Sequence, residues 1–125
     1  MGVYLKKKGE YIILEINEYQ QLALRTESHD YVCDNPRLLQ GLIGLNGEAG
    51  EALDILKKHL FHGHWLDKEH LAKELGDVAW YLAISADALG YKLEDVLKIN
   101  VEKLQKRYPE GFDSEKSINR QEGDI

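Results

Sequence analysis

The chain has 125 residues, a formal net charge of −6 and an isoelectric point near 5.3. This length suits one domain, and a hydrophobic content of 43% is enough for a core, which excludes a disordered chain. The negative charge argues against binding to nucleic acid or to an anionic membrane, because both need a basic surface. It does not exclude a small anionic substrate held by a metal ion and a local basic patch.

The first sixteen residues predict a separate N-terminal extension. Residues 3–16 alternate loosely and carry β-forming residues on both sides of Lys8-Gly9, which predicts a short hairpin of about 3–6 with 11–15. Asn17 is then expected to cap a helix over about 18–27, with Gln20 as its capping-box partner.

A long helix is predicted from Pro36, which suits a first turn, to about Leu60. It has one main apolar stripe, formed by Leu42, Leu45, Ala49, Ala52, Leu53, Leu56 and Leu60. Four glycines also occur within it, which indicates close approach of another helix or a ligand, or a break near the start: Gly41, Gly44, Gly47 and Gly50. Ile43 and Ile55 lie off the stripe, so we expect burial on more than one side in a homodimer or a homotetramer built as a dimer of dimers.

Two further helices are predicted towards the C-terminus. Asp67 is expected to cap the first, Gly90 is expected to end it, and the second spans about 93–107. We therefore expect an all-α, four-helix bundle-like fold, with a helical domain at 17–112 and a polar tail at 113–125.

Two acidic pairs point to a metal site: Glu48 with Glu51, and Glu74 with Asp77. Residues three apart lie on one side of a helix, so two helices packed side by side can bring four carboxylates together. Their mutual repulsion costs about 1 kcal/mol per pair in water and more when they are desolvated, so a bound cation is the simplest explanation for such a cluster. Carboxylates without Cys or His favour Mg²⁺ or Mn²⁺. Taken alone, each pair also fits a solvated helix face.

A polar ridge is predicted on the last helix. Asn100 falls within the apolar stripe of 93–107, and Lys103 and Arg107 follow along the same edge. An amide, an ammonium and a guanidinium in one line suit phosphate oxygens, although an ordinary amphipathic helix with one hydrogen-bonded Asn gives the same pattern. Carboxylates that bind metal, together with cations that neutralise phosphate, favour phosphoanhydride hydrolysis.

Four histidines cluster around the loop between the second and third predicted helices: His59, His62, His64 and His70. Zinc needs three or four converging ligands, and the irregular spacing without a Cys partner argues against it. The alternative is that they are surface or loop residues near an anionic substrate.

Three runs of sequence, taken in order, resemble the MazG-like nucleotide pyrophosphohydrolases of the all-α NTP pyrophosphatase superfamily. They are Gly44 to Lys58, Glu74 to Ala83, and Asn100 to Phe112. The superfamily pattern is E-x-x-E, a spacer and E-x-x-D, and here 22 residues separate Glu51 from Glu74. The resemblance covers about 17–112 and leaves the N-terminal extension outside.

The resemblance implies Mg²⁺-dependent hydrolysis of ribo- or deoxynucleoside triphosphates to the monophosphate and pyrophosphate, by attack of a metal-activated water at the α-phosphate. Mn²⁺ is an alternative ion, and Glu51 is the first choice for the base, followed by Glu48. By motif position, Asn100, Lys103 and Arg107 would hold phosphates or sugar. Smaller contributions would come from four other residues: Tyr81 and Lys58 at the phosphates, and Tyr19 and Gln20 in the base pocket.

Several alternatives remain open from the sequence. A ferritin-like di-iron protein would need Glu-x-x-His, which does not occur in this chain. A base-specific relative of the dUTPase or dCTPase type, or a non-catalytic nucleotide-binding module, would share most of the pattern. Lacking a secretory signal, a membrane span or a second cysteine to pair with Cys33, the chain is expected to be cytoplasmic.

Overall fold

The computed structural model describes residues 3–30 and 36–120, which are mainly helical. Cys33 lies outside the described residues, as do residues 121–125 of the predicted tail. The chain divides into two units, residues 1–93 and 94–125. The mainly helical fold with a short N-terminal hairpin confirms the predicted fold class.

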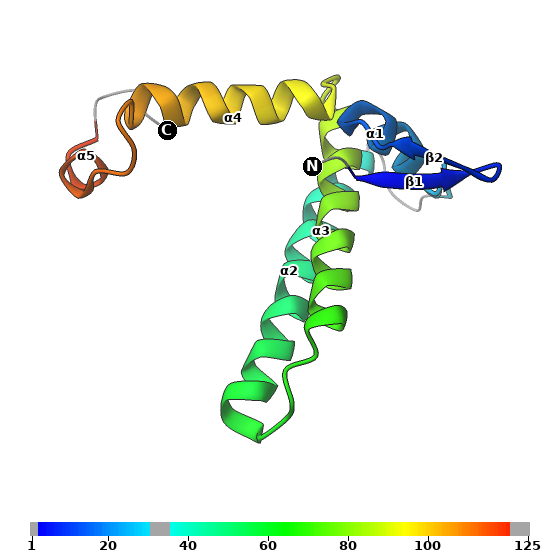
Figure 1. Ribbon diagram of the computed structural model, residues 1–125, viewed down its shortest axis with the longest axis horizontal. Helices are drawn as coiled ribbons and strands as arrows, with labels where there is room; N and C mark the ends of the chain where they lie inside the picture. Colours follow the sequence, from blue (N-terminus) through cyan, green and yellow to red (C-terminus); the bar gives the residue numbers. More distant parts are fainter. Residues whose placement is uncertain (1–2, 31–35, 121–125) are drawn as a thin grey trace. The chain divides into compact units, whose positions relative to one another are not determined.

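The N-terminal extension forms the predicted hairpin (Figure 1). Strand β1 (Tyr4–Lys7) pairs antiparallel with β2 (Glu10–Ile13). Lys8 and Gly9 both have positive φ, 50° and 89°, as a two-residue turn between right-twisted strands requires. The amine of Lys7 lies 3.5 Å from the Glu18 carboxylate on the next helix, which connects the hairpin to the helical part.

Helix α1 (Ile16–Leu24) begins earlier than predicted. Asn17 was expected to be the N-cap, but that position is taken by Glu15, which makes no capping bond with its side chain. The reason is the hairpin: the Leu14 N–H donates to the Val3 carbonyl at 2.6 Å, so the chain turns into the helix directly after β2.

Gln20 has a structural position rather than the predicted capping one. Its side chain is buried, and its amide donates to the carbonyls of Ala83 and Tyr91 at 3.3 and 3.1 Å. Its oxygen accepts from the Leu93 N–H at 2.9 Å. Both ends of the amide are thus engaged by backbone, and the role of Gln20 in a base pocket stays a prediction.

Helices α2 (Pro36–His62) and α3 (Lys68–Ala88) pack side by side over much of their length (Figure 1). A Cβ at Gly41 would overlap Ser85, and a Cβ at Gly44 would overlap the ring of Tyr81. These two glycines therefore allow the close approach of another helix that the sequence predicted. No atom of a neighbouring residue lies within 4 Å of a Cβ built at Gly47 or Gly50.

The ends of α3 lie where the sequence placed them. The Asp67 carboxylate accepts from the His70 N–H at 2.9 Å, so Asp67 is the N-cap. Beyond the C-terminus, Gly90 has a φ of 81°, a left-handed conformation that glycine adopts without strain.

An ion-pair network joins the segment that follows α1 to α2 and α3. Arg37 donates to both oxygens of Glu27 at 2.7 and 2.9 Å, and to Asp87 at 2.7 Å. These hydrogen bonds, first to Glu27 and then to Asp87, raise the pKa of Arg37 above its usual value. The Glu27 side chain is only 1% exposed, so water screens its ion pair with Arg37 poorly.

Replacing Arg37 by Ala is therefore expected to lower the free energy of unfolding by roughly 2–3 kcal/mol, because it removes two charge-assisted hydrogen bonds from a buried carboxylate. Urea unfolding followed by circular dichroism would measure this. Lys73→Ala is the matched control: it removes an exposed ion pair with Glu69 and should cost less than about 1 kcal/mol. Equal losses for the two variants would contradict the structural role of Arg37.

The buried core is small and lies where α1 meets the C-terminal part of α3. It centres on Ala23, Ala83 and Leu93, with Tyr19, Trp80 and Leu82 packed against it. Much of the apolar surface of α2 stays outside this core, and six large residues are more than half exposed: Leu39, Leu42, Ile43, Leu53, Leu60 and Phe61. The predicted α2 stripe is therefore only partly covered within one chain.

The second unit contains most of α4 (Leu93–Arg107) and a short helix, α5 (Ser114–Ile118). The bounds of α4 agree with the prediction. Helix α5 was not predicted within the polar tail; the Asp113 carboxylate caps it by accepting from the N–H groups of Glu115 and Lys116 at 2.9 and 3.3 Å. Within the part of the chain that the structure describes, no helix is long and apolar enough to span a membrane.

Candidate metal centre

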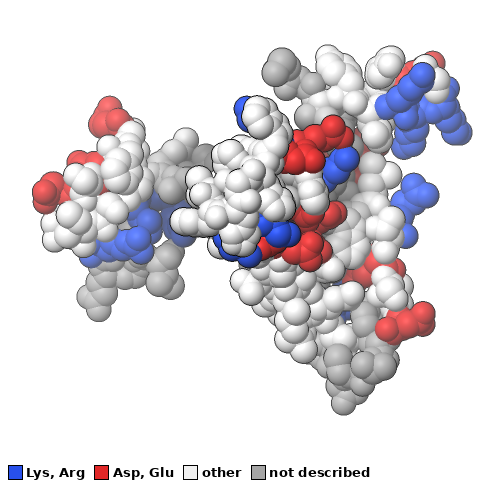
Figure 2. All heavy atoms as spheres, turned by 90° about the horizontal axis from the view of Figure 1, so that it is seen from below, with Lys and Arg blue, Asp and Glu red and all other residues white. Residues whose placement is uncertain are grey.

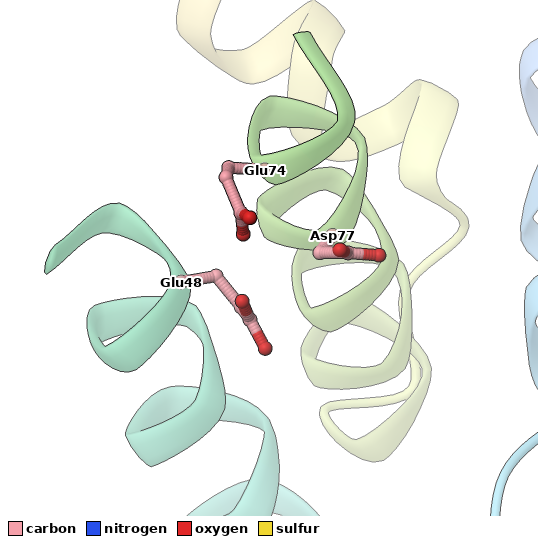
Figure 3. Close-up of side chains that lie close together, drawn as sticks. All are labelled: Glu48, Glu74 and Asp77. Carbon is pink, nitrogen blue, oxygen red and sulfur yellow. The ribbon is translucent and has the colours of Figure 1, made fainter. Parts of the chain in front are cut away.

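Three carboxylates from α2 and α3 converge, and they are Glu48, Glu74 and Asp77. Each offers an oxygen, and these oxygens all lie within 4.8 Å of one another. Figure 3 shows Glu48 reaching from α2 towards α3, which carries the other two. The close contact of Gly44 with Tyr81 lies one helical turn away on each helix and brings the two backbones together at this point. We call these three residues the carboxylate triad.

The triad is electrostatically crowded. Loss of hydration, followed by repulsion from Glu51, Asp77 and Glu74, raises the pKa of Glu48. Glu74 is 8% exposed, so water screens its charge poorly. Asp77 also acts on Tyr19 of α1, whose pKa is raised by burial and then by this carboxylate. A bound cation would relieve the repulsion, and three carboxylate oxygens fit a hard divalent ion such as Mg²⁺.

A cavity of about 370 Å³ adjoins the triad. Glu74 belongs to both, and Glu51 lines the cavity although it is not one of the three converging carboxylates. The remaining lining residues are Gly47, Gly50, Asp54, Ile55, Lys58 and His70. The four glycines of α2 thus fall into two groups: Gly41 and Gly44 allow helix packing, and Gly47 and Gly50 line the cavity without side chains of their own.

Two basic side chains lie at this cavity. The Lys58 amine is 2.7 Å from the Asp54 carboxylate, which Lys57 also contacts, and these hydrogen bonds lower the pKa of Asp54 to about 2. Nε2 of His70 is 2.9 Å from Oε1 of Glu74. An anion that arrives with a divalent ion would therefore meet carboxylates for the ion and the Lys58 ammonium for its own charge.

Residues 38–112 match the MazG nucleotide pyrophosphohydrolase domain. The chain belongs to the MazG family. It is 36% identical over 96 residues to the Gene 37 protein of Mycobacterium phage L5, a match that covers 70% of this chain and 82% of that protein. It is also 51% identical over 41 residues to the uncharacterized protein YvdC of Bacillus subtilis (strain 168), covering 33% of this chain and 39% of YvdC. No solved structure matches.

MazG membership supports nucleotide pyrophosphohydrolase activity in general, and the predicted family is confirmed. The triad and all the residues that line the cavity lie inside the matched segment, whereas the hairpin and α1 lie before it. The names of the two relatives state no activity, so they add nothing about the substrate.

The other predicted site residues of the MazG domain lie elsewhere. The ring of Tyr81 packs against Gly44 and, edge-on, against Trp80, with ring centroids 4.8 Å apart. Asn100, Lys103 and Arg107 lie on α4, in the second unit of the chain. Asn100 was expected within a buried stripe, but it is exposed, as are the neighbouring Leu97, Val101 and Leu104. Beyond the buried Leu93, the apolar stripe of α4 is therefore mostly exposed within one chain, and the role of the ridge in binding stays a prediction.

Asp54 was not singled out from the sequence, and neither were the interaction of Tyr19 with Asp77 and the contact of His70 with Glu74. For His70 a signal existed, because it stands four residues before Glu74 on a predicted helix, and such residues are neighbours. For Tyr19 there was no local signal, because its approach to Asp77 depends on how α1 packs.

On the face seen in Figure 2, the Lys and Arg side chains do not form a continuous basic surface. The Lys and Arg side chains described there occur in separate groups, with Asp and Glu between them. This distribution agrees with the net charge of −6. The expected absence of nucleic-acid and membrane partners stays a prediction.

Proposed function

We propose that this chain is a Mg²⁺-dependent nucleoside triphosphate pyrophosphohydrolase, which converts ribo- or deoxynucleoside triphosphates to the monophosphate and pyrophosphate by attack of water at the α-phosphate. The observation that carries the proposal is the carboxylate triad of Glu48, Glu74 and Asp77 next to a cavity that holds further acidic and basic groups. Membership in the MazG family supports the same class of reaction.

The triad would hold the ion, with Mn²⁺ as a substitute for Mg²⁺. When bound, the ion would neutralise charge on phosphate oxygens and make an attacking water more acidic. The packing of α2 against α3 holds the three carboxylates together in a position to bind the ion. It does so in spite of the repulsion that contributes to the raised pKa of Glu48.

Glu51 is our candidate for the general base. It lines the cavity beside Glu74 but is not one of the three converging carboxylates, so it can accept a proton from water while the triad holds the ion. Glu48 is the second candidate, because a raised pKa brings a carboxylate closer to the range in which it accepts protons from water.

The cationic groups would hold the polyphosphate. Lys58 lies at the cavity, where its amine can neutralise phosphate charge as a point charge. Asn100, Lys103 and Arg107 follow successive turns of α4, and we propose that they bind phosphates or sugar. The hydroxyl of Tyr81, one turn beyond Asp77, is proposed to donate a hydrogen bond to the triphosphate, while its ring supports the packing of α2 on α3.

The function is tested by a panel of ribo- and deoxynucleoside triphosphates with Mg²⁺, in water enriched in ¹⁸O. We expect pyrophosphate as the first product and the label in the nucleoside monophosphate, because water attacks the α-phosphorus. Orthophosphate as first product, or label in pyrophosphate, would overturn the proposed cleavage. Turnover of dUTP or dCTP alone would instead establish the base-specific alternative, and binding without turnover the non-catalytic one.

We also propose that the chain works as a homodimer or a homotetramer. The proposal is supported by the six large apolar side chains of α2 that one chain leaves more than half exposed, because contact with a second chain would remove them from water. Sedimentation equilibrium at micromolar concentration should give a mass two or four times the 14.3 kDa of one chain. A monomer at all concentrations would contradict the proposal.

A further inference from the structure

His70 is placed to act on Glu74. Both stand on α3 one turn apart, both line the cavity, and Nε2 of His70 lies 2.9 Å from Oε1 of Glu74. Asp67 accepts a hydrogen bond from the His70 backbone at 2.9 Å and so fixes the first turn of the helix, from which the imidazole extends.

Glu74 connects the triad to the cavity. It is shared by the triad and the cavity, and its side chain is only 11% exposed. A carboxylate has two oxygens and can rotate, so a hydrogen bond to Oε1 restricts the rotation and leaves the other oxygen for an ion. A neutral imidazole that carries its proton on Nε2 is sufficient for this bond.

We propose that His70 is a positioning residue for Glu74, which holds this carboxylate in the orientation that binds the divalent ion. The inference deepens the proposed function and rests on it to the extent that Glu74 is a ligand of the ion. Partners of this kind around metal sites typically change metal affinity by about 10–100-fold when they are removed. Three other charged side chains line the cavity around this pair: Glu51, Asp54 and Lys58.

The test measures Mn²⁺ affinity of the full chain without nucleotide, from the electron paramagnetic resonance signal of unbound Mn²⁺. His70→Ala should weaken binding by about 10-fold or more. His70→Gln should restore most of the affinity, because its amide N–H₂ can donate to the same oxygen. Lys73→Ala, which breaks an exposed ion pair with Glu69 on the same helix, should leave the affinity unchanged.

Two further readouts separate positioning from a structural or a direct role. The melting temperature without metal should be similar for His70→Ala and wild type, and kcat should recover towards wild type when Mg²⁺ is raised. Unchanged Mn²⁺ affinity in His70→Ala would overturn the inference. If His70→Gln binds as weakly as His70→Ala, His70 is itself a ligand of the ion and positioning is also overturned.

The outcomes stay distinct from those that test the proposed function. If wild type binds Mn²⁺ but hydrolyses no nucleotide, the function fails while the affinities of the His70 variants still decide the positioning role. If wild type hydrolyses nucleotide and His70→Ala binds Mn²⁺ normally, only the role of His70 fails.

Discussion

Asp77→Asn is expected to reduce kcat/KM for nucleotide hydrolysis by at least about 10²-fold, since removing preorganised charge at a reacting centre commonly costs this much. The amide keeps the shape of the side chain but removes one of three charges that converge within 4.8 Å. Mn²⁺ affinity should fall together with activity. The metal-free protein should be at least as stable as wild type, because the repulsion that acts on Glu48 is reduced.

Two comparisons make this result specific. Glu69→Gln removes an exposed carboxylate from the same helix and should retain wild-type activity and Mn²⁺ binding. Glu51→Gln should lose turnover by roughly 10²–10⁴-fold, the usual contribution of a general base, while it keeps most of its Mn²⁺ affinity. Near-normal hydrolysis by Asp77→Asn would show that the triad does not do the chemistry assigned to it.

Gly44→Ala is expected to destabilise the protein by about 1–3 kcal/mol, although alanine is the better helix former, because its methyl group overlaps the ring of Tyr81. Since this contact lies one turn from Glu48 and from Asp77, separating the helices here should also weaken Mn²⁺ binding. Urea unfolding and Mn²⁺ titration would measure the two effects.

Gly47→Ala is the matched control on the same helix. No neighbouring atom lies within 4 Å of the added methyl group, so this variant should be as stable as wild type or up to about 1 kcal/mol more stable. Combining Gly44→Ala with Tyr81→Ala should recover part of the loss, as expected for residues in contact. Equal stability of Gly44→Ala and Gly47→Ala would mean that helix packing does not depend on Gly44.

The elements that could be predicted are those with local signals. Lys8-Gly9 predicted the hairpin, and Asp67 and Gly90 predicted both ends of α3, because turn and cap preferences act over a few residues. The prediction that Asn17 caps α1 was wrong, although Asn is a good capping residue. The hydrogen bond from Leu14 to Val3 sets the start of this helix instead.

The contacts that could not be predicted join residues far apart in the sequence. Gln20 bonds to backbone more than sixty residues away, and Arg37 joins Glu27 to Asp87. No periodicity marks such partners. The acidic pairs could be recognised because they repeat at helical spacing. Which carboxylates converge depends on how α2 and α3 pack, so the sequence could not show that Glu48 joins the triad and Glu51 does not.

The central claim is that Glu48, Glu74 and Asp77 hold a divalent ion. Crystals grown with Mn²⁺, with anomalous difference maps recorded near the manganese absorption edge, test it most directly. The account predicts a peak bounded by oxygens of these three carboxylates, with His70 still hydrogen-bonded to Glu74. A well-diffracting crystal with no peak among them, and with their carboxylates turned towards solvent, would contradict it.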